Sequence, residues 1–191
     1  KPKGVLINYP QLEGAPRAME YFVTLHEKDT SFCALPLSHF GGLVFLQGML
    51  FLGTTIVLME RFAPIEFLKN VQNHKVGCFW LVPSMYYAIL QLKEFEIFDL
   101  SSLKWVVSFG APSSADQLRR FHQYCSHADL INGWGMTETQ GPTIVLPNDS
   151  KKIESVGLPA PWVEIKIFDD NDKEVETGKV GEIVVRSWIV A

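Results

Sequence analysis

The chain has 191 residues, of which 47% are apolar and 20% charged, and its 17 basic and 21 acidic side chains give a net charge of −4. This length predicts one compact domain that can carry a small appendage, and the composition excludes disordered and collagen-like chains. The basic residues are scattered, which argues against a nucleic-acid backbone or an anionic membrane as the main partner. Small molecules are therefore the favoured ligands.

The three cysteines, Cys33, Cys78 and Cys125, lie far apart and form no C-x-x-C pair. An odd count without matching histidine spacing supports neither a disulfide framework nor a structural zinc site. We expect three buried thiols in a reducing compartment, which favours a cytoplasmic protein. The chain starts at Lys1 without an initiator Met or a signal peptide, so we also expect a fragment whose site lacks any upstream part.

A long uncharged stretch covers residues 30–59, which contain no Asp, Glu, Lys or Arg and could on paper cross a bilayer. Proline at position 36 and glycines at positions 41, 42, 48 and 53 divide it, and its last part is β-branched. We therefore favour a buried helix over residues 42–52, followed by a buried strand over residues 54–59. A membrane span is the alternative.

Helices and strands are expected to alternate downstream of this stretch. Pro64 suits a first helical turn, Ser84 can cap a helix that runs to residue 92, and Ser114 with Gln117 forms a capping box for a later helix. Apolar runs typical of strands separate these helices at residues 78–82, 105–109 and 129–132. The alternation predicts an α/β fold with a mostly parallel sheet that is flanked by helices on both faces.

The pattern changes near Ile153. Residues 163–167 and 181–186 alternate between apolar and polar side chains, and residues 169–172 supply an acidic turn. Such alternation is typical of an antiparallel hairpin with one solvated face. We therefore predict an α/β core over residues 1–152, followed over residues 153–191 by the start of a small antiparallel β subdomain.

Two of the predicted strands end in segments that suit a ligand, because open α/β sheets bind ligands at the carboxyl ends of their strands. The strand at 105–109 runs into the small residues Gly110, Ala111 and Pro112, which let a flat ligand lie against the backbone. The strand ending at Ile131 runs into a predicted glycine-rich turn over residues 132–139.

The second segment offers three kinds of contact for a nucleotide. Trp134, between two glycines, can stack on a planar ring, Thr137 can donate a hydrogen bond to a phosphate, and Glu138 can hold Mg²⁺. An ordinary turn with a capping threonine and a solvated glutamate explains the spacing equally well.

A resemblance decides between these interpretations. Residues 133–138, Gly-Trp-Gly-Met-Thr-Glu, resemble the aromatic-Gly-x-Thr-Glu motif of the adenylate-forming superfamily, which includes acyl-CoA synthetases, luciferases and the adenylation domains of peptide synthetases. Four further blocks resemble family motifs in the family order: residues 2–5, 36–42, 108–112, and 155–159 together with Gly181, Glu182 and Arg186. The resemblance covers essentially the whole chain and implies the fold of the AMP-binding domain.

The resemblance also implies a reaction and roles for named residues. A carboxylate attacks the α-phosphorus of ATP, pyrophosphate leaves, and a thiol, most often that of coenzyme A, then takes the acyl group. Thr137, Glu138 and His39 would be the catalytic residues, with Glu138 as the Mg²⁺ ligand and His39 beside the acyl carboxylate; a histidine satisfied by backbone partners is the alternative for His39. The implied nucleotide-binding residues are Gly110, Ala111, Pro112, Asn132, Gly133, Trp134, Gly135, Met136 and Thr137.

Several parts of the family site are absent from this sequence: the body of the phosphate loop, the ribose-binding aspartate and the C-terminal domain with its lysine. We therefore expect this polypeptide by itself to be inactive or nearly so. The helix at 42–52 and the run at 80–86 would flank the acyl pocket and carry no acidic residue. This favours a fatty or other apolar acid, with an aryl-acid ligase or a carrier-loading enzyme second and a non-catalytic nucleotide-binding module as the rival class.

Overall fold

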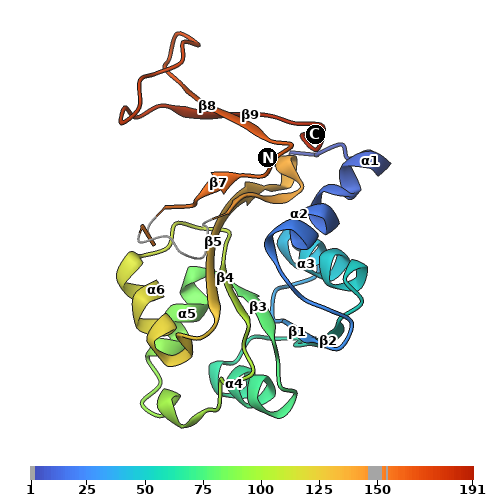
Figure 1. Ribbon diagram of the computed structural model, residues 1–191, viewed down its shortest axis with the longest axis vertical. Coiled ribbons are helices and arrows are strands. Elements are labelled where there is room, and N and C mark those ends of the chain that lie inside the picture. The colour runs from blue at the N-terminus through green and yellow to red at the C-terminus, as the bar shows by residue number, and fades with distance from the viewer. Residues whose placement is uncertain (1–2, 146–151, 154) are drawn as a thin grey trace.

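A computed structural model describes residues 3–145, 152–153 and 155–191, with the side chains of residues 142–145 left out (Figure 1). Pro2, in the first of the family-like blocks, therefore lies outside the described residues. The larger sheet has the strand order β2-β1-β3-β4-β5-β6-β7, and a separate sheet pairs β8 (Glu164–Phe168) with β9 (Glu182–Arg186). The strands of the larger sheet are β1 (Thr30–Cys33), β2 (Thr55–Leu58), β3 (Cys78–Leu81), β4 (Trp105–Ser108), β5 (Asp129–Met136), β6 (Gly141–Val145) and β7 (Leu158–Pro159).

Helices cover both faces of this sheet, as predicted. The α-helices are α1 (Tyr9–Leu12), α2 (Gly14–Phe22), α3 (Phe40–Phe51), α4 (Pro64–Asn73), α5 (Pro83–Leu90) and α6 (Ala115–His122). Short 3₁₀ turns are η1 (Phe95–Ile97), η2 (Gln123–Cys125) and η3 (Thr137–Thr139). The five strands from β2 to β5 in the sheet order are parallel, whereas β6 and β7 are antiparallel to their neighbours.

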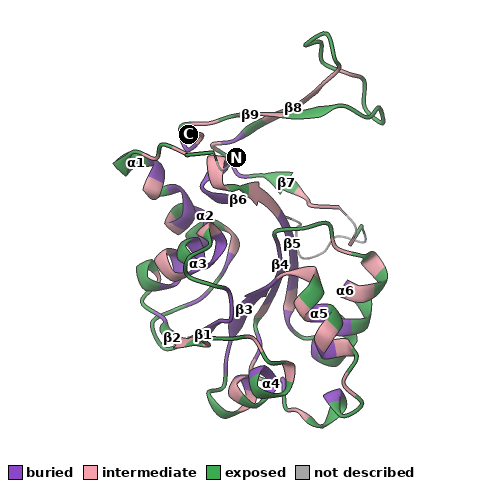
Figure 2. Cartoon of the chain, turned by 180° about the vertical axis from the view of Figure 1, so that it is seen from behind, coloured by how far each residue is buried: buried purple, intermediate pink, exposed green. Residues whose placement is uncertain are grey.

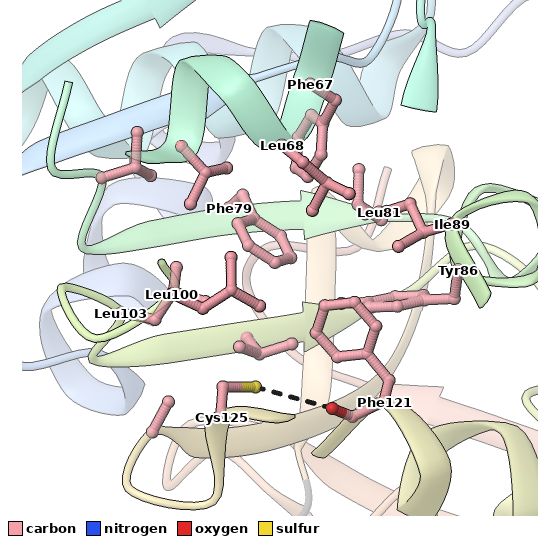
Figure 3. Close-up of a cluster of buried hydrophobic side chains, with 14 of the residues drawn as sticks. Phe67, Leu68, Phe79, Leu81, Tyr86, Ile89, Leu100, Leu103, Phe121 and Cys125 are labelled. Carbon is pink, nitrogen blue, oxygen red and sulfur yellow. Dashed lines mark hydrogen bonds between the residues drawn. The ribbon is translucent and has the colours of Figure 1, made fainter. Parts of the chain in front are cut away.

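Alternate residues of the strands point into two separate cores. Phe79 and Leu81 of β3 pack against α4, α5 and α6, and Figure 3 shows these side chains with their neighbours. Cys78 and Trp80 of the same strand pack on the opposite face, against α2 and α3. Because both faces are covered, β3 is buried at every position, as Figure 2 shows for the middle of the sheet.

The uncharged stretch at 30–59 forms β1, α3 and β2, and none of the described helices is long and apolar enough to cross a bilayer. The helix begins at Phe40, two residues earlier than predicted, because His39 caps it. The prediction that the following strand is buried is wrong. β2 lies at the edge of the sheet and pairs only with β1 among the described strands, so its ends are exposed.

Both predicted side-chain caps are wrong. The helix α5 starts at Pro83, since proline suits a first helical position, so Val82 occupies the cap position and Ser84 lies inside the first turn. Ser114 does occupy the position before α6, but its side chain makes no cap hydrogen bond. Gln117 instead donates its side-chain amide to the carbonyl of Pro83, which ties α6 to α5.

The fifth strand is longer than predicted. β5 continues from Asp129 to Met136, so the predicted turn over residues 132–139 is wrong for residues 132–136 and starts at Thr137. β6 returns beside this segment and pairs with residues 133–136, with an irregularity between Trp134 and Gly135. The pairing with β6 overrides the local preference of the glycines for a turn, because it provides hydrogen-bond partners for the backbone N–H and C=O groups of this segment.

The predicted hairpin is confirmed as β8 (Glu164–Phe168) and β9 (Glu182–Arg186), paired antiparallel. The side chain of Asp169 accepts the backbone N–H groups of Asn171 and Lys173, which closes the acidic turn. A small apolar cluster that includes Val163 and Ile189 packs against Phe22 of α2. The division between residues 152 and 153 stays a prediction, and β7, beyond that point, joins the larger sheet.

Candidate functional site

Two adjoining hollows lie at the carboxyl ends of β4 and β5, where the sheet order places neighbouring parallel strands. The first has a volume of about 320 Å³ and is lined by Gly110, Ala111, Pro112, Ser113, Asn132, Gly133, Trp134, Gly135 and Val156. The second has a volume of about 190 Å³ and is lined by His39, Phe40, Gly41, Phe109, Gly110, Gly135, Met136, Thr137 and Gly141. Gly110 and Gly135 border both, so the two hollows meet at these glycines.

The loop after β4 forms one wall of the first hollow. Gly110 has a φ of 91°, a backbone conformation that disfavours side chains, and a Cβ atom there would lie 3.4 Å from Val82. The hydroxyl groups of Ser108 and Ser113 are 2.7 Å apart and hydrogen-bonded, which ties the far end of the loop back to its strand. The loop therefore presents its backbone to the hollow from a fixed position.

Asn132 links the two walls of the first hollow. The residue is 3% exposed, and its side-chain nitrogen donates to the carbonyls of Ile153 at 3.3 Å and Ser155 at 3.1 Å. These bonds hold the segment that carries Val156 against the hollow. The sequence predicted Asn132 as a residue at the ligand, whereas its amide nitrogen is also committed to the protein itself.

Trp134 borders the first hollow and is only partly buried, so its indole does not belong to either core. It lies on β5 at the irregular pairing with β6, between Gly133 and Gly135. A planar ring entering this hollow would meet an aromatic side chain and the backbone of the Gly110 loop. Such an arrangement suits the stacking of a planar base.

His39 lies at the N-terminus of α3 and borders the second hollow. Its Nδ1 atom accepts the backbone N–H of Gly41 at 3.0 Å, so the ring is satisfied by the backbone and lines the hollow at the same time. Because Nδ1 is the acceptor, a neutral ring carries its proton on Nε2 and offers a hydrogen-bond donor there. The backbone partner that the alternative interpretation expected is present, and the role of His39 beside an acyl carboxylate stays a prediction.

Thr137 and Glu138 lie next to each other on η3, at the end of β5. Thr137 borders the second hollow, whereas Glu138 is partly exposed and borders neither. No side chain among the described residues is hydrogen-bonded or ion-paired to the Glu138 carboxylate, and no group of three metal-ligating side chains occurs in the described parts of the chain. A lone carboxylate that shares a cation with ligand phosphates is a donor set that suits Mg²⁺.

The described linings carry no acidic or basic side chain apart from His39. A phosphate here would be met by hydroxyl and backbone N–H groups. The sequence did not single out Ser113, Phe109 or Val156 as lining residues. Ser113 could have been found as the fourth residue of the small-residue loop, whereas Val156 lies on a segment that is held by Asn132 and by the pairing of β7 with β6.

These features define an α/β domain with a nucleotide-sized cleft at the carboxyl ends of its parallel strands. The chain belongs to the AMP-binding enzyme family, whose model matches residues 1–191. It is 34% identical over 202 residues to "4-coumarate--CoA ligase-like 6" of Arabidopsis thaliana, an alignment that covers 98% of this chain and 34% of that protein. The chain thus spans about a third of the length of the relatives it matches.

Solved structures agree with this assignment. A putative long-chain-fatty-acid CoA ligase from Rhodopseudomonas palustris superposes with a TM-score of 0.84 at 28% identity, over 99% of this chain and 47% of that one. The o-succinylbenzoate CoA synthetase of Bacillus subtilis, solved with its acyl-adenylate intermediate, gives a TM-score of 0.87 at 27% identity, over 100% of this chain and 38% of that one.

Proposed function

We propose that the whole protein is an ATP-dependent, AMP-forming carboxylate:CoA ligase. The observation that carries the proposal is the meeting of the two hollows: Trp134 borders one, Thr137 borders the other, and Gly110 and Gly135 border both. A nucleotide can therefore place its base in the first hollow and its α-phosphate near the second. The acid would enter the second hollow beside His39.

The proposed reaction has two steps, adenylation of the acid and transfer of the acyl group to coenzyme A. A carboxylate oxygen of the acid attacks the α-phosphorus, and the bond from that phosphorus to pyrophosphate breaks. The thiol of coenzyme A then loses its proton and attacks the acyl carbon, and AMP leaves. Catalysis of this kind depends on positioning and on compensation of charge.

The residues of this chain would contribute contacts to these steps. The Thr137 hydroxyl would donate to an α-phosphate oxygen, and the His39 Nε2–H group would donate to the carboxylate of the acid. The Glu138 carboxylate would hold Mg²⁺, which when bound offsets phosphate charge. Asn132 and the Gly110 loop would fix the walls around the base.

We propose a fatty or other apolar acid as the substrate. Phe40, Phe109 and Met136 border the second hollow beside His39 and provide an apolar surface for an acyl group. An aryl acid is the second candidate, favoured by the two phenylalanine rings in this lining and by the name of the Arabidopsis relative. The three cysteines are free and buried, as is common in proteins of reducing compartments, and we propose a cytoplasmic location.

The test is acid-dependent exchange of pyrophosphate into ATP by the full-length protein, with acetate, medium-chain, long-chain and aromatic acids. We expect the highest exchange with a medium- or long-chain acid. Highest exchange with an aromatic acid would select the second candidate, and highest exchange with an amino acid would refute both.

A second measurement separates the enzyme from a non-catalytic nucleotide-binding module. We expect Glu138→Ala to abolish the Mg²⁺ dependence of ATP binding by the full-length protein, since this carboxylate is the proposed metal ligand. Glu176→Ala, an exposed glutamate of the β8–β9 connection, is the matched control. ATP binding that ignores both the metal and the Glu138 substitution would favour the non-catalytic module.

A further inference from the structure

The residue that follows η3 has an uncommon backbone conformation. Gln140 lies in the left-handed region with φ 58° and ψ 33°, although it is not a glycine. Residues with a Cβ atom pay an energetic cost there, and glycine or asparagine occupies such positions at lower cost. Gln140 is also only 2% exposed, so its polar side chain is removed from solvent.

The nitrogen and the oxygen of the Gln140 side-chain amide differ in their hydrogen bonding. The Nε2 atom donates to the carbonyl oxygen of Thr137 at 3.1 Å, and the backbone N–H of Gln140 donates to the same oxygen at 3.2 Å. The Oε1 atom is buried and has no hydrogen-bond partner among the described residues. A buried acceptor without a partner is destabilising, so Gln140 is unfavourable for stability both in its backbone and at this oxygen.

The neighbouring carbonyls of the same turn are also held. The buried hydroxyl of Thr139 accepts the backbone N–H of Met136 at 2.9 Å and lies 3.2 Å from the Met136 carbonyl. The backbone N–H of Ala191 donates to the Glu138 carbonyl at 2.8 Å. The Thr139 hydroxyl lies equally far, 3.2 Å, from the carbonyl of Gly141. The carbonyls of Thr137 and Glu138 are thus each bonded within the protein, and the side chains of Met136 and Thr137 border the second hollow.

We propose that Gln140 is a positioning residue that holds the Thr137 backbone so that its hydroxyl is directed into the second hollow. Gln140 touches neither hollow and acts through the Thr137 carbonyl, which it binds twice. Local strain and an unpaired buried atom are typical of positions kept for a functional geometry. The inference deepens the proposed function and rests on it for its catalytic consequence.

The decisive variant is Gln140→Met in the full-length protein. Methionine keeps the length and the Cβ atom but can neither donate to Thr137 nor leave an unpaired oxygen. We expect the urea midpoint of unfolding to match or exceed that of the parent. We expect kcat for acid-dependent pyrophosphate exchange to fall about ten-fold or more, since a small misplacement of a phosphate contact has large kinetic effects. The dissociation constant of adenosine, which lacks the phosphate that Thr137 would contact, should stay within about two-fold, because base stacking in the first hollow is untouched.

Gln123→Met, an exposed residue of η2, is the matched control and should behave as the parent in all three measurements. Parental kcat in Gln140→Met would overturn the proposal. A fall in kcat that merely follows a lower urea midpoint would overturn it too, because it would show a structural role only. If the methionine variant does not fold, Gln140→Gly removes the side chain and the backbone strain together, and it should show the same loss of kcat.

One readout does not depend on activity. The backbone amides of Met136 and Gln140, which are hydrogen-bonded to Thr139 and Thr137, should exchange hydrogen about ten-fold faster in Gln140→Met, while the core strands keep their protection. Unchanged exchange in this segment would refute the positioning role. A parent protein without any acid-dependent pyrophosphate exchange would refute the proposed function instead, and the hydrogen-exchange comparison would still decide about Gln140.

Discussion

The imidazole of His39 accepts the backbone N–H of Gly41, and the two atoms lie 3.0 Å apart. This bond satisfies one of the free N–H groups at the start of α3, so His39 is the N-cap of that helix. The same ring borders the second hollow, beside Thr137. One side chain therefore serves helix stability with Nδ1 and is available to a ligand with Nε2.

The two uses of this ring can be separated by substitution. We expect His39→Ala to lower the free energy of unfolding by about 1 kcal/mol, because the cap is lost. His39→Asn keeps an acceptor for the Gly41 N–H and should retain most of the stability. Both variants lack the imidazole, and both should lower pyrophosphate exchange by the full-length protein. Equal stability of the two variants in urea unfolding would contradict the capping role.

Trp134 provides a test of the first hollow. Stacking on a base contributes about 1–3 kcal/mol, so Trp134→Ala should weaken AMP binding about five-fold to a hundred-fold, whereas Trp134→Tyr should retain most of the affinity. Titration calorimetry on the full-length protein measures both. Tyr124→Ala removes an aromatic side chain from η2 and should leave the affinity unchanged. Normal AMP affinity in Trp134→Ala would rule out the assignment of this hollow to adenine.

Gly42 lets α3 approach the segment before it. A Cβ atom at this position would lie 2.4 Å from the carbonyl oxygen of Pro36, and a backbone atom cannot move aside as a flexible side chain can. We expect Gly42→Ala to lower the free energy of unfolding by about 1–3 kcal/mol, as other overpacked sites do. Gly4→Ala is the control, since nothing lies within 4 Å of its added atom. Equal unfolding midpoints for the two variants would contradict this close approach.

The buried thiols predict how stability depends on pH. Burial raises the pKa of Cys125 to about 12, and burial likewise raises the pKa values of Cys78 and Tyr86. Thiols of the unfolded chain ionise near about pH 8.5, so above this pH the unfolded state binds fewer protons than the folded state. The stability that the folded state gains by keeping these buried groups neutral is fully present below about pH 8.5 and is lost as the pH rises towards about 12.

Urea unfolding at several alkaline pH values measures this loss. We expect the free energy of unfolding to fall between about pH 8.5 and about pH 11, and to fall less steeply in Cys125→Ala, which lacks one of the ionising groups. Identical slopes for the parent and the variant would show that the Cys125 thiol does not contribute.

Local patterns predicted those elements whose signal is contained within their own residues. The hairpin at 163–167 and 181–186 was found within one residue at each end, because alternation and an acidic turn are local properties. The caps at Ser84 and Ser114 were wrong, because a cap depends on which groups the packed helix leaves free. Pro83 began α5 one residue early and placed Ser84 inside its first turn, and Gln117 of α6 binds α5 instead of the cap.

Residue order alone determined the alternation of helices and strands, the division of apolar residues between two faces, and the motif that carries Trp134, Thr137 and Glu138. Tertiary structure decided what depends on which segments pair with and pack against each other. The pairing of β6 turned a glycine-rich segment into strand, and the place of β2 at the sheet edge exposed it. Asn132 brought Val156 to the hollow through bonds to residues 153 and 155. The apolar periodicity of a helix or strand is a property of residues close together in the sequence. Strand order and the walls of a cleft depend instead on which segments pair and pack in the folded chain.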